Sequence, residues 1–167
     1  ATSTAASGAQ VIADQSVDFQ MSQNDVPLRV AVLGSTGSIG KNTLEVIAAS
    51  DGRFEVYLLC GHRSIDMLVE QARIYRPRWV VVTDPTAAAA IGSGAFPEGT
   101  ELVIGPERLE ELLAAPEVDR VVSAIVGAAG LRSTWSALAA GKTVALANKE
   151  TLVTAGPLVT QLAARSG

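Results

Sequence analysis

Three glycines, three residues apart at positions 34, 37 and 40, form the motif GSTGSIG. The segment before it, RVAVL at 29–33, is short, apolar and rich in valine, as a buried β-strand is. Dinucleotide-binding domains hold a pyrophosphate at such a turn between a strand and a helix. Gly34 would permit the tight turn, Gly37 would let the pyrophosphate reach the backbone, and Gly40 would let the helix pack close to the sheet.

Backbone N–H groups supply the other half of this chemistry. The helix N-terminus is expected to leave several of them free, and the helix macrodipole favours an anion there. The residues concerned are Thr36, Gly37, Ser38 and Ile39. We therefore interpret 34–40 as a cofactor-binding turn. The alternative is a glycine turn that binds nothing.

The end of the second predicted strand indicates which cofactor is bound. FEVYLLC at 54–60 is followed by GHRS at 61–64. NAD-binding domains usually place a carboxylate here for the ribose 2′-hydroxyl, whereas NADP-binding domains use a cation near the 2′-phosphate. The carboxylate is missing but Arg63 is present, and a guanidinium binds a phosphate through two hydrogen bonds. This predicts NADP, with His62 beside the adenine or ribose; the alternative is a solvated surface Arg63.

Two further segments follow later strands, at the edge where open α/β sheets bind ligands. VGAAG at 126–130 is small enough for a cofactor to lie flat against it. A loop of Asn148, Lys149 and Glu150 offers an amide, an ammonium and a carboxylate to ribose, phosphate and nicotinamide groups. Taken alone, each segment is more typical of an ordinary loop than of a binding site.

Alternating elements must position these segments. Apolar runs predict six strands, and apolar residues at helical spacing predict helices beginning near residues 39, 65, 109 and 131. The strands are expected at 29–33, 54–60, 79–83, 101–104, 120–125 and 143–147. Strands without alternation suit a parallel sheet covered on both faces. The fold class is therefore α/β: a Rossmann-like, doubly wound, mainly parallel sheet with helices on both faces.

Turn and cap residues support these boundaries. Ser64 is expected to cap the second helix and Pro77 to end it, while Pro106 suits a first helical position and Gly141 a helix stop. Thr86–Gly99 is expected to form a weak short helix and then a loop.

Composition bounds the function classes. The 167 residues suit one domain, and 48% hydrophobic with 18% charged residues excludes a wholly disordered chain. A net charge of −4 argues against nucleic acid, and the absence of a long apolar run argues against a membrane span. One cysteine and one histidine exclude an internal disulfide framework and a Cys/His zinc cluster. A reducing compartment, the cytoplasm, is expected.

Residues 1–27 differ from the rest because they contain no lysine or arginine. They match neither a transit peptide nor a secretory signal. A disordered tail, or an artificial leader before a natural start at Met21, is expected ahead of an NADPH-binding domain at 28–167.

The three motifs together closely resemble the 1-deoxy-D-xylulose 5-phosphate reductoisomerase family in order and spacing. They are GSTGSIG at 34–40, AIVGAAGL at 124–131 and LANKETLV at 146–153, and the resemblance covers about 29–164. It implies an NADPH-dependent enzyme that also needs a divalent metal, Mg or Mn. The family converts 1-deoxy-D-xylulose 5-phosphate to 2-C-methyl-D-erythritol 4-phosphate in the methylerythritol phosphate route to isoprenoids.

The resemblance also implies residue roles. The pyrophosphate region would be held by Thr36, Gly37, Ser38 and Ile39, and the 2′-phosphate end by Gly61, His62 and Arg63. NADPH would also be contacted by Asn148 and Glu150. Lys149 would reach the phosphosugar substrate. Many members carry Asn where Arg63 stands, often after a basic residue at the His62 position. The phosphate contact is therefore open between these two residues.

The family's acidic metal cluster and substrate-binding histidine lie further along, in a catalytic domain. Since the sequence stops at Gly167, we expect the cofactor half alone, inactive, with neither catalytic residues nor metal ligands. The full-length enzyme is expected to be a homodimer formed largely by other parts.

Three other protein classes are alternatives. A short-chain reductase needs Tyr-x-x-x-Lys, which neither Tyr57 nor Tyr75 begins. An aspartate-semialdehyde-dehydrogenase type needs a nucleophilic cysteine beyond the nucleotide half, and Cys60 at the end of a strand is a poor candidate. A non-catalytic NADP-sensing module stays open as the alternative.

Overall fold

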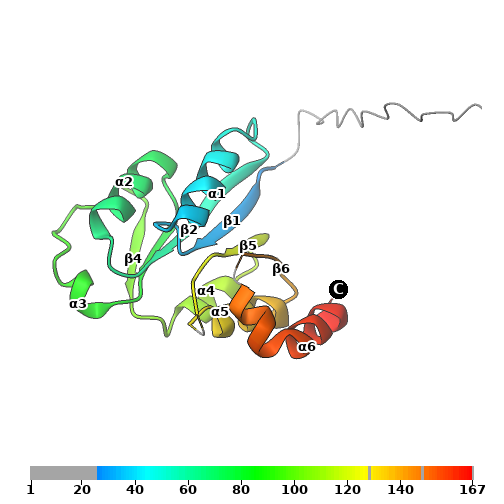
Figure 1. Ribbon diagram of the computed structural model, residues 1–167. Helices are drawn as coiled ribbons and strands as arrows, with labels where there is room; N and C mark the ends of the chain where they lie inside the picture. The colour runs from blue at the N-terminus through cyan, green and yellow to red at the C-terminus, as the bar shows by residue number, and fades with distance from the viewer. Residues whose placement is uncertain (1–25, 128, 148, 167) are drawn as a thin grey trace, which may run out of the picture.

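Strands and helices alternate through the part of the chain that the computed structural model describes, residues 26–127, 129–147 and 149–166 (Figure 1). The strands are β1 (Leu28–Leu33), β2 (Phe54–Gly61), β3 (Trp79–Val82), β4 (Glu101–Ile104), β5 (Arg120–Ser123) and β6 (Thr143–Leu146). The helices are α1 (Ser38–Ala48), α2 (Ile65–Tyr75), α3 (Pro85–Ala88), α4 (Leu109–Ala114), α5 (Ala129–Ala139) and α6 (Lys149–Ser166). The prediction of a tail at 1–27 falls almost wholly outside the described residues.

The strands form one parallel sheet in the order β4-β3-β2-β1-β5-β6. From β1 the chain builds outward through β2 and β3 to β4, then crosses back to place β5 on the other side of β1. This reversal between β1 and β5 is the topological switch point, where doubly wound sheets bind ligands at the carboxyl ends of their strands. The predicted fold class is confirmed.

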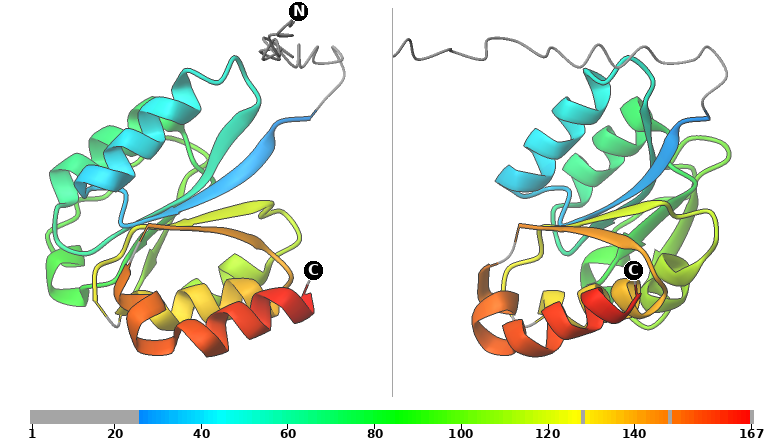
Figure 2. Two further views of the ribbon diagram at one scale, coloured as in Figure 1. Left: turned by 45° about the vertical axis from the view of Figure 1, so that its right-hand side comes forward. Right: turned by 90° about the vertical axis from the view of Figure 1, so that its right-hand side faces the viewer.

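Both faces of the sheet carry an apolar core, and β1 serves both. Val30 and Val32 face the side covered by α1, α2 and α3, while Ala31 and Leu33 face α4 and α5. All four are at most 3% exposed, which explains why the strand reads as a continuous apolar run. Figure 2 shows α1 and α2 on one side of the sheet and α4, α5 and α6 on the other. Among the described helices, none combines the length and apolarity needed to cross a bilayer.

The helix stops predicted at Pro77 and Gly141 are confirmed. Pro77 stands two residues beyond the end of α2. After α5, Gly141 takes φ +72°. Its N–H donates to the Leu138 carbonyl at 2.9 Å, and the N–H of Lys142 donates to the Ala137 carbonyl at 3.0 Å. These two bonds satisfy the last carbonyls of α5 in the glycine-dependent way that the sequence indicates.

Pro106 is not a first helical position, because α4 begins only at Leu109. Gly105, at φ +89°, turns the chain out of β4, and the Pro106 carbonyl then accepts the N–H of Leu109 at 3.1 Å. Ser64 does occupy the N-cap of α2, but its side chain makes no capping hydrogen bond. The short helix predicted within 86–99 is α3, followed by a loop.

Helix α6 is not predicted from the sequence. Gly156 and Pro157 interrupt its apolar spacing, and the helix accommodates them with a kink at Ala155. α6 packs against α5 (Figure 2).

Candidate functional site

The glycine turn connects β1 to α1 at the switch point. Gly34 has φ +75°, and a Cβ there would lie 2.7 Å from the carbonyl oxygen of Ala124. A side chain at this position is therefore excluded by backbone conformation and by contact. A Cβ on Gly40 would meet the Gly34 carbonyl oxygen and lie 2.5 Å from the Cα of Ser35. The close packing predicted for Gly40 is thus against the turn rather than against the strands.

Gly37 differs from its two neighbours in the motif. Its φ of −78° and ψ of 171° suit any residue, and a Cβ would meet only the Gly34 carbonyl oxygen, at 3.4 Å. Its N–H donates to that same oxygen at 3.1 Å, so the prediction that this N–H is free is wrong: it closes the turn. The N–H groups of Ser38, Ile39 and Gly40 precede the first intrahelical bond of α1, from Lys41 to Gly37. The first turn of α1 contains no acidic residue, which leaves its positive dipole end uncompensated.

Buried hydrogen bonds fix the turn to β2 and α2. The N–H groups of Gly34 and Ser35 both donate to the carbonyl of Cys60, at 2.9 and 3.0 Å. The fully buried Ser35 hydroxyl donates to Gln71 Oε1, and Gln71 Nε2 donates back to the Ser35 carbonyl, both at 2.8 Å. Sequence reasoning missed Gln71. Its signal is a polar residue on the apolar face of α2, three residues after Leu68.

His62 and Arg63 lie at the end of β2, as predicted, and both contact residues that follow β3. Arg63 Nε donates to Asp84 Oδ2 at 2.6 Å, and His62 Nδ1 lies 2.9 Å from Thr83 Oγ1. Hydrogen bonding from Arg63 is the main cause that lowers the pKa of Asp84, ahead of the opposing effect of burial. Neither Thr83 nor Asp84 is predicted from the sequence as a site residue.

A cavity of about 730 Å³ opens where these segments meet, a volume in the usual range for small-molecule sites. Five of the predicted residues around the first two strand ends line it. These lining residues are Gly34, Thr36, Gly37, Gly61 and His62. Its opposite wall comes from the turn before α4, the start of α4 and the segment after β5, including Pro106, Leu109 and Ile125. The side chain of Ile39 instead lines a separate apolar groove that includes residues of β5 and β6.

The later predicted segments reach the same edge of the sheet. The N–H of Ala124 donates to the Leu33 carbonyl, and that of Ala147 donates to the Ser123 carbonyl, at 2.9 and 3.0 Å. The loop predicted at 148–150 is partly wrong, because Lys149 and Glu150 begin α6. Asn148 lies outside the described residues.

Cys60 is buried within this edge, and burial raises the pKa of its thiol to about 12. The thiolate is therefore scarce near neutral pH, which agrees with the poor nucleophile that the sequence predicts. Among the described residues, no group of three or more His, Cys, Asp or Glu side chains could hold a metal ion.

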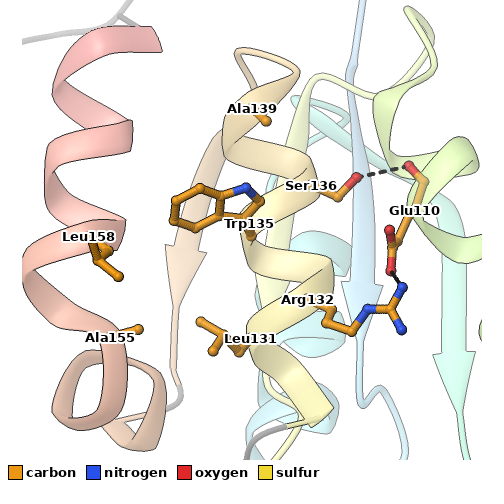
Figure 3. A pocket seen from close by; sticks show the side chains of 8 residues that line it. All are labelled: Glu110, Leu131, Arg132, Trp135, Ser136, Ala139, Ala155 and Leu158. Carbon is orange, nitrogen blue, oxygen red and sulfur yellow. Dashed lines mark hydrogen bonds and ion pairs between the residues drawn. The ribbon is translucent and has the colours of Figure 1, made fainter.

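A second hollow of about 460 Å³ lies between α5 and α6 (Figure 3). Trp135 extends from α5 toward α6, and Leu158 faces it from α6. Trp135 is 42% exposed, so it is less buried than a core position on the predicted apolar face would be. The charged side chains of this hollow, Glu110 and Arg132, pair with each other at 2.8 Å. It offers neither a glycine turn nor an uncompensated helix end.

A parallel doubly wound sheet, a glycine turn at its switch point and a cation at the end of β2 define a dinucleotide-binding domain of the Rossmann type. The model of the 1-deoxy-D-xylulose 5-phosphate reductoisomerase family matches residues 30–156. The chain belongs to this family, which confirms the resemblance drawn from the three motifs.

Relatives and solved structures agree with that assignment. The chain is 48% identical over 141 residues to 1-deoxy-D-xylulose 5-phosphate reductoisomerase of Methylococcus capsulatus, covering 83% of this chain and 36% of that protein. The Zymomonas mobilis enzyme, solved in complex with NADPH, matches with a TM-score of 0.75 and 36% identity over 84% of this chain and 37% of that one. A reductoisomerase solved with NADPH, fosmidomycin and magnesium matches with a TM-score of 0.75 and 38% identity, over 84% and 35%. The chain thus spans about a third of the length of these relatives.

Proposed function

We propose that this chain is the NADPH-binding part of a 1-deoxy-D-xylulose 5-phosphate reductoisomerase. The observation that carries the proposal is the cavity at the switch point, where the glycine turn and the end of β2 meet in a member of this family. The Zymomonas mobilis relative was solved with NADPH, which supports the same ligand here. Family membership also favours the enzyme over a non-catalytic NADP-sensing module.

The pyrophosphate is assigned to the start of α1. The N–H groups of Ser38, Ile39 and Gly40 have no acceptor within the helix, and phosphate oxygens would satisfy them. Thr36 and Gly37 line the cavity beside them. Since Gly37 needs no unusual backbone conformation, its lack of a side chain is best explained by a ligand that approaches the backbone.

The adenosine 2′-phosphate is assigned to Arg63, with Gly61 and His62 beside it. Arg63 uses only Nε toward Asp84, and its two Nη groups donate to no residue of the described part of the chain. Those groups match the two-bond geometry by which guanidinium binds phosphate. Thr83 Oγ1 donates to the Gly61 carbonyl at 3.4 Å, so His62 Nδ1 is assigned as the donor to Thr83, while His62 Nε2 lies 3.9 Å from Asp84 Oδ2.

Asn148 and Glu150 are proposed as further NADPH contacts and Lys149 as a substrate contact. α6 begins at Lys149 on the ligand-binding edge of the sheet, which supports these roles. The relatives are more than twice as long as this chain, and the described residues hold no metal cluster. We therefore assign the metal site and the remainder of the phosphosugar site to the part of the enzyme that this chain does not span. The homodimer and the cytoplasmic location stay predictions.

Binding and turnover of the 167-residue chain test this proposal together. NADPH at a hundred times its dissociation constant should stabilise the folded chain by about 2.7 kcal/mol and raise its melting temperature. With 1-deoxy-D-xylulose 5-phosphate and magnesium, NADPH absorbance should not fall above the enzyme-free background. A melting temperature unmoved by NADPH would contradict the binding role, and substrate-dependent oxidation would reveal a metal site within this chain.

Cofactor choice is tested by Arg63→Ala. A hydrogen bond to a charged group contributes about 1.5–3 kcal/mol, so NADPH should bind about 10- to 150-fold more weakly. NADH affinity should hardly change, because NADH lacks the 2′-phosphate. Equal losses for both cofactors would show that Arg63 is structural and would move the phosphate contact to His62 or Ser64.

A further inference from the structure

The side chains of two residues that follow β3 contact the side chains of two residues that follow β2. Thr83 contacts His62, and Asp84 contacts Arg63, in each case across 21 positions of sequence. We call these four residues the β2–β3 clasp. His62 and Arg63 expose 62% and 75% of their side chains, whereas Asp84 exposes only 11%. The clasp thus joins an exposed imidazole to Thr83 and an exposed guanidinium to the carboxylate of Asp84, at the edge of the sheet.

Backbone and side-chain donors hold the Asp84 carboxylate in place. Its Oδ1 accepts the N–H of Thr86 at 2.9 Å and that of Ala87 at 3.4 Å, which caps α3. Its Oδ2 accepts Arg63 Nε at 2.6 Å. Three donors therefore surround the carboxylate, and they compensate much of its charge. The bonds to the backbone of α3 therefore fix the position of the Asp84 carboxylate, which serves as an anchor for the arginine.

This anchor limits the freedom of Arg63. A solvent-exposed arginine has many rotamers, and a ligand that binds it must remove that freedom. The bond through Nε has already restricted the side chain in the absence of ligand. It also leaves both Nη groups without a partner among the described residues, where a phosphate can accept from them.

We propose that Asp84 is a positioning residue that strengthens the preference for NADPH over NADH by holding the guanidinium of Arg63. The proposal rests on the proposed function, since it presupposes a 2′-phosphate at Arg63. A bare carboxylate near this phosphate would repel it and favour NADH instead. The geometry points the other way, because the Asp84 charge is paired with the guanidinium and with two backbone donors.

The test replaces Asp84 by serine. Serine caps helices about as well as aspartate, so Asp84→Ser keeps α3, but its hydroxyl is too short to hold Arg63. Calorimetric titration of the 167-residue chain should show NADPH affinity falling about 2- to 10-fold with NADH unchanged. Asp66→Ser is the matched control, because it removes the same charge from the exposed first turn of α2 without touching the clasp. NADPH affinity in that control should stay or rise slightly.

A double-mutant cycle separates positioning from a general structural effect. In the Arg63→Ala background, Asp84→Ser should cause no further loss of NADPH affinity, because the group that Asp84 positions is gone. Unchanged or stronger NADPH binding in Asp84→Ser, or equal losses for NADPH and NADH, would overturn the proposal. If Arg63→Ala itself failed to discriminate between the cofactors, the phosphate assignment would fall first, and the role of Asp84 with it.

Discussion

Replacing Gly37 by valine should remove NADPH binding while keeping the fold. The backbone there is extended, and the only close neighbour of a new Cβ is the Gly34 carbonyl oxygen at 3.4 Å, an ordinary contact. Losing a favourable N-cap residue costs about 1 kcal/mol, which lowers the melting temperature by about 2–4 °C in a chain of this size. The branched side chain, however, would stand in the cavity beside the N–H groups of Ser38 to Gly40.

The loss of affinity follows from the bonds that the side chain blocks. If two charge-assisted hydrogen bonds of about 1.5–3 kcal/mol each cannot form, NADPH binding falls by about two to four powers of ten. Calorimetric titration measures the affinity, and a circular-dichroism melt checks the fold. Gly92→Val is the matched control, since a Cβ there meets nothing within 4 Å and no positive φ is required. Near-native NADPH affinity in folded Gly37→Val would refute the pyrophosphate assignment.

Three further predictions concern single residues. Gly40→Ala should strongly destabilise the chain, because its Cβ would collide with the backbone of Ser35; a melting temperature within 2 °C of the parent would contradict this contact. Cys60 should react with a thiol reagent no faster at pH 8 than the unfolding rate allows, because burial raises its pKa to about 12; rapid labelling of the folded chain would show an accessible thiolate. The pKa of Asp84 is lowered in the folded state, so its contribution to stability is complete above its ordinary value of 3.8 and is lost as the pH falls below that value through the folded-state pKa. The melting temperatures of the parent and of Asp84→Ser should therefore converge in acid. A difference in melting temperature that persists at pH 2 would contradict this prediction.

The fold could be predicted from the sequence because its signals are local. Strands buried on both faces are apolar throughout, as Val30 to Leu33 show. The glycine turn is marked by the regular spacing of its glycines directly after such a strand. The polar partners of the site could not be predicted in the same way. Gln71 lies 36 positions from Ser35, and Asp84 lies 21 positions from Arg63, so only the folded sheet brings them together.

Errors in the element boundaries have local causes too. The sequence predicts a loop at the start of α6 because Lys149 and Glu150 are as common in loops as at helix starts, and Pro157 breaks the helical pattern further on. Pro106 is an acceptable first helical residue, but the turn that Gly105 initiates delays α4. Ile39 is predicted to bind the cofactor through its backbone N–H, and its side chain lines the separate apolar groove beside β5 and β6.

A ¹⁵N-resolved NMR titration of the 167-residue chain with NADPH would show where the cofactor binds. We expect the largest shifts in the backbone N–H signals of Ser38 to Gly40 and of Gly61 to Arg63. The indole N–H of Trp135, in the separate hollow of Figure 3, should stay unchanged. With NADH in place of NADPH, the shifts near Arg63 should shrink while those of α1 persist. Shifts centred on Trp135, or none at the glycine turn with saturating NADPH, would contradict the assignment of the cofactor site.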